Sequence, residues 1–137
     1  MRLFVMAALS GAMLAACTEA PAPLTGAALV ERGDYLVNGV VLCGDCHTPR
    51  LENMALDESR ELQGGMLPPA PGMASLAPEL AGIPANYSEE QFIAFLQTGV
   101  RPDGSHPLPP MPPYRLNEED ARAVSAYIAT LPRAAAE

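Results

Sequence analysis

The run Cys43-Gly44-Asp45-Cys46-His47 constrains this chain more than any other part of its sequence. Two cysteines three positions apart, followed at once by a histidine, form the C-x-x-C-H pattern. On a helical turn the two thiols lie on one face, close enough to add to the two vinyl groups of one porphyrin. His47 then reaches the iron from below. The motif therefore predicts one covalently attached c-type haem, with thioether links at Cys43 and Cys46 and an axial ligand at His47.

The alternatives for the two cysteines are a redox dithiol, a disulfide, or half of a zinc site. A zinc site needs four ligands, but the remaining Cys and His are Cys17 and His106, and the sequence has no second C-x-x-C and no H-x-x-x-H. A thioredoxin-like dithiol needs a βαβ context, which the sequence does not predict. Haem attachment is therefore the favoured interpretation.

The second axial ligand decides the class of function, because a haem with His47 alone would leave an open site for gas or peroxide chemistry. A strong sixth ligand makes the haem an electron carrier instead. The candidate side chains are His106, Met111, Met73, Met66 and Met54. Met111 lies in Pro109-Pro110-Met111-Pro112-Pro113, where fixed φ angles can hold a thioether against iron at little cost in ordering. We predict Met111 as the sixth ligand, with the other four as alternatives.

The His47 ring also needs an acceptor for the N–H that does not face the iron. Pro49 follows two residues later and is placed for its carbonyl oxygen to accept this hydrogen. The alternative for Pro49 is a proline that only shapes a turn. Because a thioether ligand favours ferrous iron, His47 and Met111 together predict a higher midpoint potential than two histidines would give.

The first 16 residues have the pattern of an export signal. Arg2 supplies a charged start, residues 3–13 are apolar, and small residues precede Cys17. The stretch is too short to span a bilayer. Leu14-Ala15-Ala16-Cys17 resembles a bacterial lipobox, which implies cleavage before Cys17 and lipidation of that cysteine. An ordinary signal peptide with an incidental cysteine is the alternative, and Thr18 after the cysteine favours sorting to the outer membrane.

These patterns divide the chain into four segments. We expect a lipoprotein signal over 1–16, a lipidated Cys with a Pro- and Ala-rich tether over 17–26, a haem-binding domain over 27–132 and a short tail over 133–137. The mature chain has the size of one small domain. It has 4 Tyr, 3 Phe and no Trp, so a haem would supply bulk that its interior lacks. We therefore expect the haem-free protein to be largely unfolded.

Helical signals occur in three stretches of the domain. Apolar residues recur at helical spacing over 27–42 and predict a helix that leads into the C-x-x-C-H run. Ser88 and Gln91 form a capping box before a second helix, which Gly99 ends. Asn117 caps a third helix, which Pro132 ends. The core face of that third helix is predicted to be Ala121, Val124, Tyr127, Ile128 and Leu131.

The Pro-rich stretches between these helices are predicted to be irregular. Residues 100–113 contain too many prolines for regular structure. Residues 48–86 are predicted to be mostly loop, with one short helical turn around 53–62 as an option. Loops of this length can pack on the two faces of a porphyrin, so the haem explains how they would be ordered.

The charge of the chain indicates its partners. Asp and Glu number 16 against 8 Arg and no Lys, which gives a formal charge of −8. This balance excludes a nucleic-acid-binding surface. Most of these carboxylates are expected only to aid solubility. The rest are expected to steer docking to a basic patch on a redox partner protein, so that electron transfer slows as the salt concentration rises.

The order of helix, C-x-x-C-H, loops, Pro-flanked Met and final helix resembles that of class I c-type cytochromes, over about residues 27–132. The runs 33–37, 43–50 and 97–104 are similar to the cytochrome c subunits of bacterial periplasmic dehydrogenases. The resemblance implies an all-α fold of three to four helices with long loops around one covalent haem c. It also implies a contact between Gly33 and Tyr127 where the first and last helices cross. Arg50 and Tyr87 match positions that bind haem propionates.

The chain departs from those subunits in two ways: it has one C-x-x-C-H motif where they commonly have two or three haem domains, and a lipobox where they often have a membrane helix. The favoured function is that of a single-haem electron carrier, not an enzyme, tethered by lipid on the periplasmic side. It would pass electrons between a periplasmic redox enzyme and a respiratory acceptor. The alternatives are a fixed electron-transfer subunit of a dehydrogenase or oxidase complex, and a haem enzyme or gas sensor with an open sixth site.

Overall fold

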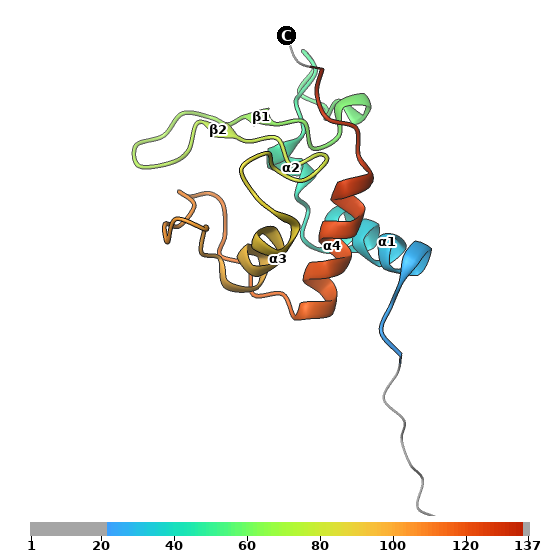
Figure 1. Ribbon diagram of the computed structural model, residues 1–137. Helices are drawn as coiled ribbons and strands as arrows, with labels where there is room; N and C mark the ends of the chain where they lie inside the picture. The colour runs from blue at the N-terminus through green and yellow to red at the C-terminus, as the bar shows by residue number, and fades with distance from the viewer. Residues whose placement is uncertain (1–21, 136–137) are drawn as a thin grey trace, which may run out of the picture.

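The computed structural model describes residues 22–135. The predicted signal over 1–16 and the predicted lipid attachment at Cys17 lie outside these residues. The described chain is mostly helical, and its helices gather on one side of a set of long loops (Figure 1). The tail begins against the domain, because the side chain of Arg133 donates to the carbonyl oxygen of Gly82 at 2.7 Å.

The first predicted helix is confirmed, but it changes its winding before it ends. Helix α1 covers Gly26–Tyr35 and continues directly into η1, a π-helical turn over Leu36–Val40 that includes Gly39. Leu42 then has a φ of 57°, in the left-handed region that a leucine rarely adopts. This residue ends the helix and turns the chain into α2, the single turn Gly44–His47 that carries the C-x-x-C-H motif.

Helix α1 crosses helix α4, Glu118–Thr130, at Gly33 (Figure 1). A Cβ atom at Gly33 would overlap the carbonyl oxygen of Ala123 and would lie 2.7 Å from the Cβ of Tyr127. Only a glycine allows the two backbones to approach this closely. The expected contact between Gly33 and Tyr127 is therefore confirmed.

The caps of the other two helices agree with prediction. Helix α3 covers Glu89–Thr98, and at its start Ser88 and Gln91 exchange both hydrogen bonds of a capping box. It ends at Gly99, whose φ of 71° is left-handed. At the start of α4, the side chain of Asn117 accepts a hydrogen bond of 2.8 Å from the backbone of Asp120.

The stretch between α2 and α3 differs in part from prediction. Its one short helix, η2, is a 3₁₀ turn over only Glu58–Arg60. The strands β1, Gly65–Met66, and β2, Leu76–Ala77, pair antiparallel with Gly65 opposite Ala77. This hairpin extends away from the helices (Figure 1). With two residues in each strand and prolines in the loop between them, it has no alternation of apolar and polar residues that would reveal it in sequence.

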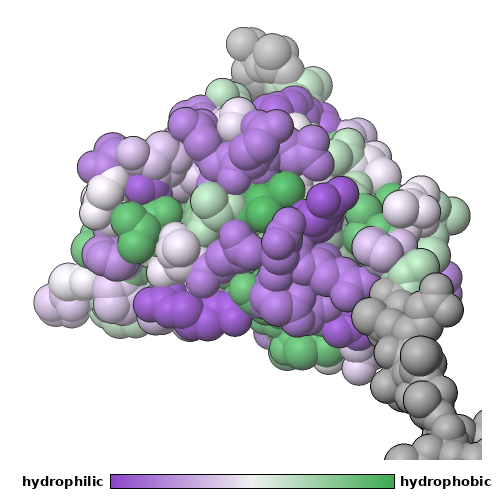
Figure 2. Space-filling model, turned by 60° about the horizontal axis from the view of Figure 1, so that its bottom comes forward, coloured by the Kyte–Doolittle hydropathy of each residue, from purple (hydrophilic) through white to green (hydrophobic). Residues whose placement is uncertain are grey.

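The core lies where α1, α3 and α4 meet the loops. Its buried apolar residues are Leu36, Val37, Leu62, Leu80, Ala81, Phe92, Phe95, Leu96, Ala121, Ala123, Val124 and Ile128. On the predicted core face of α4, Ala121, Val124 and Ile128 are buried, while Tyr127 and Leu131 are half-buried. Within residues 22–135, no helix is both long and apolar enough to cross a membrane. The face of the molecule in Figure 2 is mainly hydrophilic, with its apolar residues in separate small areas.

Candidate functional site

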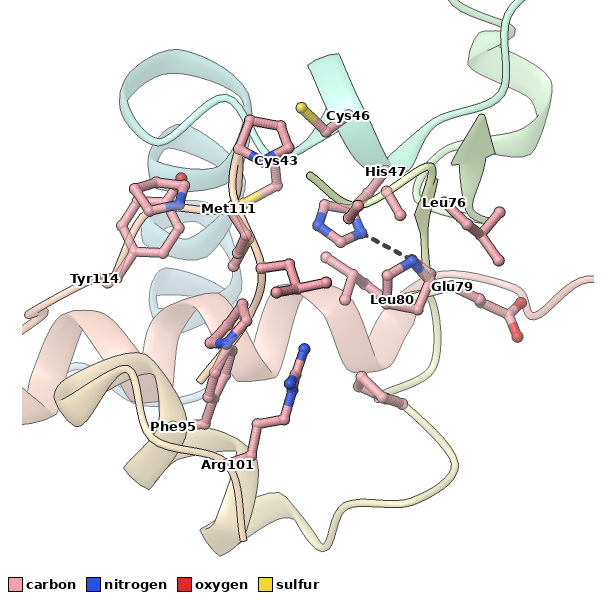
Figure 3. Close-up of a pocket in the computed structure, with 18 of the residues that line it drawn as sticks. Cys43, Cys46, His47, Leu76, Glu79, Leu80, Phe95, Arg101, Met111 and Tyr114 are labelled. Carbon is pink, nitrogen blue, oxygen red and sulfur yellow. Dashed lines mark hydrogen bonds between the residues drawn. The ribbon is translucent and has the colours of Figure 1, made fainter. Parts of the chain in front are cut away.

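A mostly apolar cavity of about 590 Å³ lies between α2, α3, the hairpin and the Pro-rich loop that follows α3. Cys43, Cys46, His47, Met111 and Tyr87 all line it. Figure 3 shows Cys43 and Met111 near each other on one side of this space and His47 on another. The structure thus brings together five residues that the sequence separates by up to two thirds of the domain.

The two cysteines of the motif carry free thiols and are half-buried. Burial is the main cause that raises the pKa of the Cys43 thiol to about 11, and the neighbouring Cys46 adds to it. A redox-active dithiol has the opposite property, a lowered pKa that produces thiolate at neutral pH. The surroundings of Cys43 therefore argue against a redox-active dithiol.

The His47 ring is held by Pro78, not by Pro49. Its Nδ1 lies 2.8 Å from the carbonyl oxygen of Pro78 (Figure 3). A carbonyl oxygen only accepts, so Nδ1 carries the hydrogen and Nε2 keeps a lone pair for a metal. Burial lowers the pKa of His47, which also favours the neutral, ligating form.

The predicted role of Pro49 is therefore wrong. The carbonyl oxygen of Pro49 accepts instead from the backbone of Asp57 at 2.8 Å. A chain leaving a one-turn helix carries the carbonyl two residues later away from the ring, whereas Pro78 returns to it from a distant part of the sequence. Pro49 shapes the loop after α2.

Among the five candidates for the sixth ligand, Met111 is the one that lines the cavity. Met54, Met66 and Met73 are exposed, with 66%, 77% and 41% of their surface accessible. His106 is also exposed, and its Nδ1 lies 3.1 Å from the carbonyl oxygen of Gly99. Met111 is half-buried and packs against the core.

The hairpin connects the segments that carry His47 and Met111. At its base, Gly64 donates a backbone hydrogen bond of 2.8 Å to the carbonyl oxygen of His47. In the loop just before β2, Ala74 donates one of 2.7 Å to the carbonyl oxygen of Pro109, two residues before Met111. The hairpin therefore fixes both sides of the cavity relative to each other.

The residues present fit a covalent haem. Two thiols, one imidazole with a free Nε2 and one thioether face a cavity that is otherwise lined largely by apolar side chains. Bound there, a haem would supply an iron that cycles between ferric and ferrous states. Within residues 22–135, no group of three or more His, Cys, Asp or Glu is arranged to hold a metal ion by itself.

Of the two residues expected near the propionates, Tyr87 lines the cavity and Arg50 does not. The two terminal nitrogens of Arg50 donate to the carbonyl oxygens of Met54 and Asp45, at 2.8 and 2.9 Å. Arg50 therefore lies in a separate groove and closes a surface loop. The expectation that it binds a propionate is not supported by its position.

Sequence reasoning did not predict the roles of Pro78, Tyr114 and Arg101, which also line the cavity. The hydroxyl of Tyr114 donates to the carbonyl oxygen of Val41 at 3.3 Å, and burial raises the pKa of Tyr114 to about 12. Tyr114 follows Met111 by three residues, so its closeness in sequence to the predicted ligand could have indicated that it lies near the same site. Arg101 lies in the run 97–104, which is similar to the cytochrome c subunits of dehydrogenases. No residue pattern around Pro78 indicates that its carbonyl oxygen would reach His47.

Comparison with known proteins agrees with this geometry. A sequence model of the cytochrome c family matches residues 30–132. The chain is 35% identical over 107 residues to a diheme cytochrome c-type protein of Cereibacter sphaeroides, covering 74% of this chain and 35% of that protein. It is 34% identical over 128 residues to the cytochrome c subunit of a quinone alcohol dehydrogenase of Gluconacetobacter polyoxogenes, covering 82% of this chain and 26% of the subunit.

A third relative is the corresponding subunit of Gluconobacter oxydans, which is 32% identical over 120 residues. That alignment covers 75% of this chain and 24% of the subunit. The chain thus spans about a third or less of the length of these curated relatives. The four α-helices of residues 22–135 agree with the expected small haem-binding fold, and the structure adds the small hairpin to it.

Proposed function

The chain belongs to the cytochrome c family of electron-transfer proteins, and we propose that it carries electrons through one haem c whose iron is held by His47 and Met111. The observation that supports this most is the position of Met111, which alone among five candidate ligands lines the cavity with His47. Cys43 and Cys46 would form the thioether links. With both axial positions filled, the protein itself performs no bond chemistry.

The midpoint potential tests this ligand set. Replacing the thioether by an imidazole stabilises ferric iron, so Met111→His should lower the midpoint potential markedly. Met73→His is the matched control, because Met73 is exposed and does not line the cavity. An unchanged potential in Met111→His, or an equal change in Met73→His, would contradict the assignment. Potentiometric titration followed by optical spectra measures both.

We also propose that the chain carries a single haem. Its sequence has one C-x-x-C-H run, although one relative is named a diheme protein. The alignment covers only 35% of that relative, so its name does not imply a second haem in this chain. An iron-to-protein ratio of one in the purified protein is the expected result.

For its location, we propose the periplasmic side of a bacterial membrane, with Cys17 lipidated after removal of residues 1–16. The support is the sequence pattern before Cys17 and the Pro-rich stretch 17–26, which would let the domain stand away from the lipid. Thr18 favours the outer membrane as the site of the anchor. Mass spectrometry of the N-terminal peptide would detect the lipid.

The partners are proposed to be redox proteins with a basic docking patch, since the chain is acidic.

A second candidate function is a fixed subunit of a dehydrogenase complex. The relatives named as cytochrome c subunits of quinone alcohol dehydrogenases favour it. A stable partner that remains bound during purification from the native membrane supports the fixed subunit, and its absence supports the mobile carrier.

A further inference from the structure

Arg101 provides the one guanidinium among the described residues that line the cavity. It follows the left-handed end of α3 at Gly99, and its backbone is fixed by a tight loop. The backbone N–H of Arg101 donates to the carbonyl oxygen of Ser105 at 2.8 Å, and that of Gly104 donates back to Arg101 at 2.9 Å. Asp103 accepts from the backbone of Ser105 at 2.9 Å, which braces the same loop.

The Arg101 side chain extends from this loop into the cavity, beside Phe95 (Figure 3). Its Nη1 donates to the carbonyl oxygen of His106 at 2.8 Å and lies 3.3 Å from the hydroxyl of Ser105. These two bonds use one of the three guanidinium nitrogens. They aim the side chain and leave donors on the other two nitrogens available.

No carboxylate of the described chain forms an ion pair with Arg101. The acid nearest in sequence is the exposed Asp103, whose pKa is lowered mainly by its hydrogen bonds from Ser105 and to a smaller extent by the charge of Arg101. The ion pairs within residues 22–135 are Arg32 with Asp120 and Arg60 with Asp57. The acid that shares the cavity wall, Glu79, points away from Arg101 (Figure 3) and accepts a hydrogen bond of 2.6 Å from the backbone of Ala134. A cation beside an apolar cavity that forms no ion pair with a carboxylate of the described chain is suited to an anionic ligand.

Tyr87 is a polar neighbour of Arg101 at the cavity wall. The two side chains are close enough for the charge of Arg101 to act on the Tyr87 hydroxyl, although burial has the larger effect and raises the pKa of Tyr87. Tyr87 also packs edge-on against Phe92 and Phe95, with ring centres 5.9 and 5.8 Å away. This packing fixes where its hydroxyl lies.

We propose that Arg101, with Tyr87 beside it, binds a propionate carboxylate of the haem, in the role that the sequence alone assigned to Arg50. A guanidinium binds a carboxylate through two parallel N–H donors, which suits the free nitrogens of Arg101. The inference rests on the proposed function, because it requires a haem in the cavity. It adds a cation that keeps one propionate ionised.

The charge of this pair determines how the variant should behave. In Arg101→Gln the propionate loses its cation, so an unpaired negative charge near the iron stabilises the ferric state and lowers the midpoint potential. The same loss raises the pKa of the propionate. As the pH falls, the propionate of the variant takes up a proton, and its potential rises toward that of the wild type.

The test measures midpoint potential from about pH 5 to about pH 9, a range that covers the titration of perturbed carboxyl groups. Arg101→Gln is expected to differ from the wild type most at high pH and least at low pH, while Arg101→Lys differs less at every pH. The controls are Arg50→Gln, at the position expected from sequence, and Arg122→Gln, an exposed residue of α4 with the same change in charge. Both controls should show only a constant, small offset.

A constant offset in Arg101→Gln equal to that of Arg122→Gln overturns the proposal, and so does a pH-dependent effect confined to Arg50→Gln. If Arg101→Gln does not mature, the wild type still gives an answer through ¹³C-labelled propionates followed by nuclear magnetic resonance. One propionate should then stay ionised below its ordinary titration range of about pH 4–5, and ordinary titration of both overturns the assignment. A wild type without covalent haem would instead contradict the proposed function itself.

Discussion

At the scale of single residues, two hydrogen bonds, one part-buried and one buried, hold the loops around His47. One joins Nδ1 of His47 to the carbonyl oxygen of Pro78. In the other, the backbone N–H of Leu62 donates to the hydroxyl oxygen of Thr48 at 3.0 Å. In each bond the two partners are far apart in sequence. The bonds therefore fix the loop after η2, which contains Leu62 and Pro78, relative to the haem motif.

Thr48→Val tests the second of these bonds. Valine keeps the shape of the side chain but leaves the buried N–H of Leu62 without its acceptor, which should lower the free energy of unfolding by about 1–3 kcal/mol. Chemical denaturation of the holoprotein measures this change. Thr130→Val is the control, because Thr130 is exposed at the end of α4. Equal stability in the two variants would show that the Thr48 bond contributes nothing.

Residues placed by local chain geometry were predictable, whereas Pro78, which a long loop brings to His47, was not. Cys43, Cys46 and His47 could be identified because one helical turn determines their relation. Met111 could be proposed because its flanking prolines restrict the backbone. Pro78 could not, since it reaches His47 only after the intervening loop has folded back. The prediction for Pro49 failed because it assumed that the acceptor would be a near neighbour.

At the scale of elements, local signals explain the helices well. The capping residues Ser88 and Asn117 marked the starts of α3 and α4, because a cap depends on side chains within three residues. The hairpin of β1 and β2 was not predicted, since two-residue strands carry no periodicity. The hairpin is held by hydrogen bonds on both of its sides, from Gly64 before β1 to His47 and from Ala74 before β2 to Pro109.

The crossing of α1 and α4 yields a prediction at this scale. In Gly33→Ala the new methyl group would overlap the carbonyl oxygen of Ala123, so the helices must separate. The expected loss is about 1–3 kcal/mol of unfolding free energy, the typical cost of overpacking a core. Gly39→Ala is the matched control, because its methyl group would meet only the Tyr35 ring, at an ordinary 3.5 Å. Thermal unfolding of the two variants compares them, and equal midpoints would contradict close packing at Gly33.

At the scale of the whole molecule, most of the buried apolar residues lie on the helices, and a cavity separates the helices from some of the loops. Helices α1 and α3 both pack against α4, while the hairpin and the Pro-rich loop of Met111 face a cavity of about 590 Å³. Figure 1 shows these loops spread out beside the helices. A group that fills the cavity would contact loops from several parts of the chain at once, and its covalent links would prevent its loss.

The haem-free protein should therefore be largely unfolded. Cys43→Ala/Cys46→Ala removes both thioether links, and without haem the apolar cavity wall would be exposed to water. Near-ultraviolet circular dichroism of this variant, purified without haem, should show no fixed tertiary packing. A native-like spectrum would show that the protein core is sufficient without the cofactor.

Carbon monoxide binding to the reduced protein tests the central claim most directly, because this ligand needs an open position on the haem iron. With His47 and Met111 both bound, the wild type should remain inert. Met111→Ala, which opens the sixth position, should bind carbon monoxide rapidly and tightly. Rapid, tight binding by the wild type, equal to that of Met111→Ala, would contradict the account and indicate a haem enzyme or gas sensor.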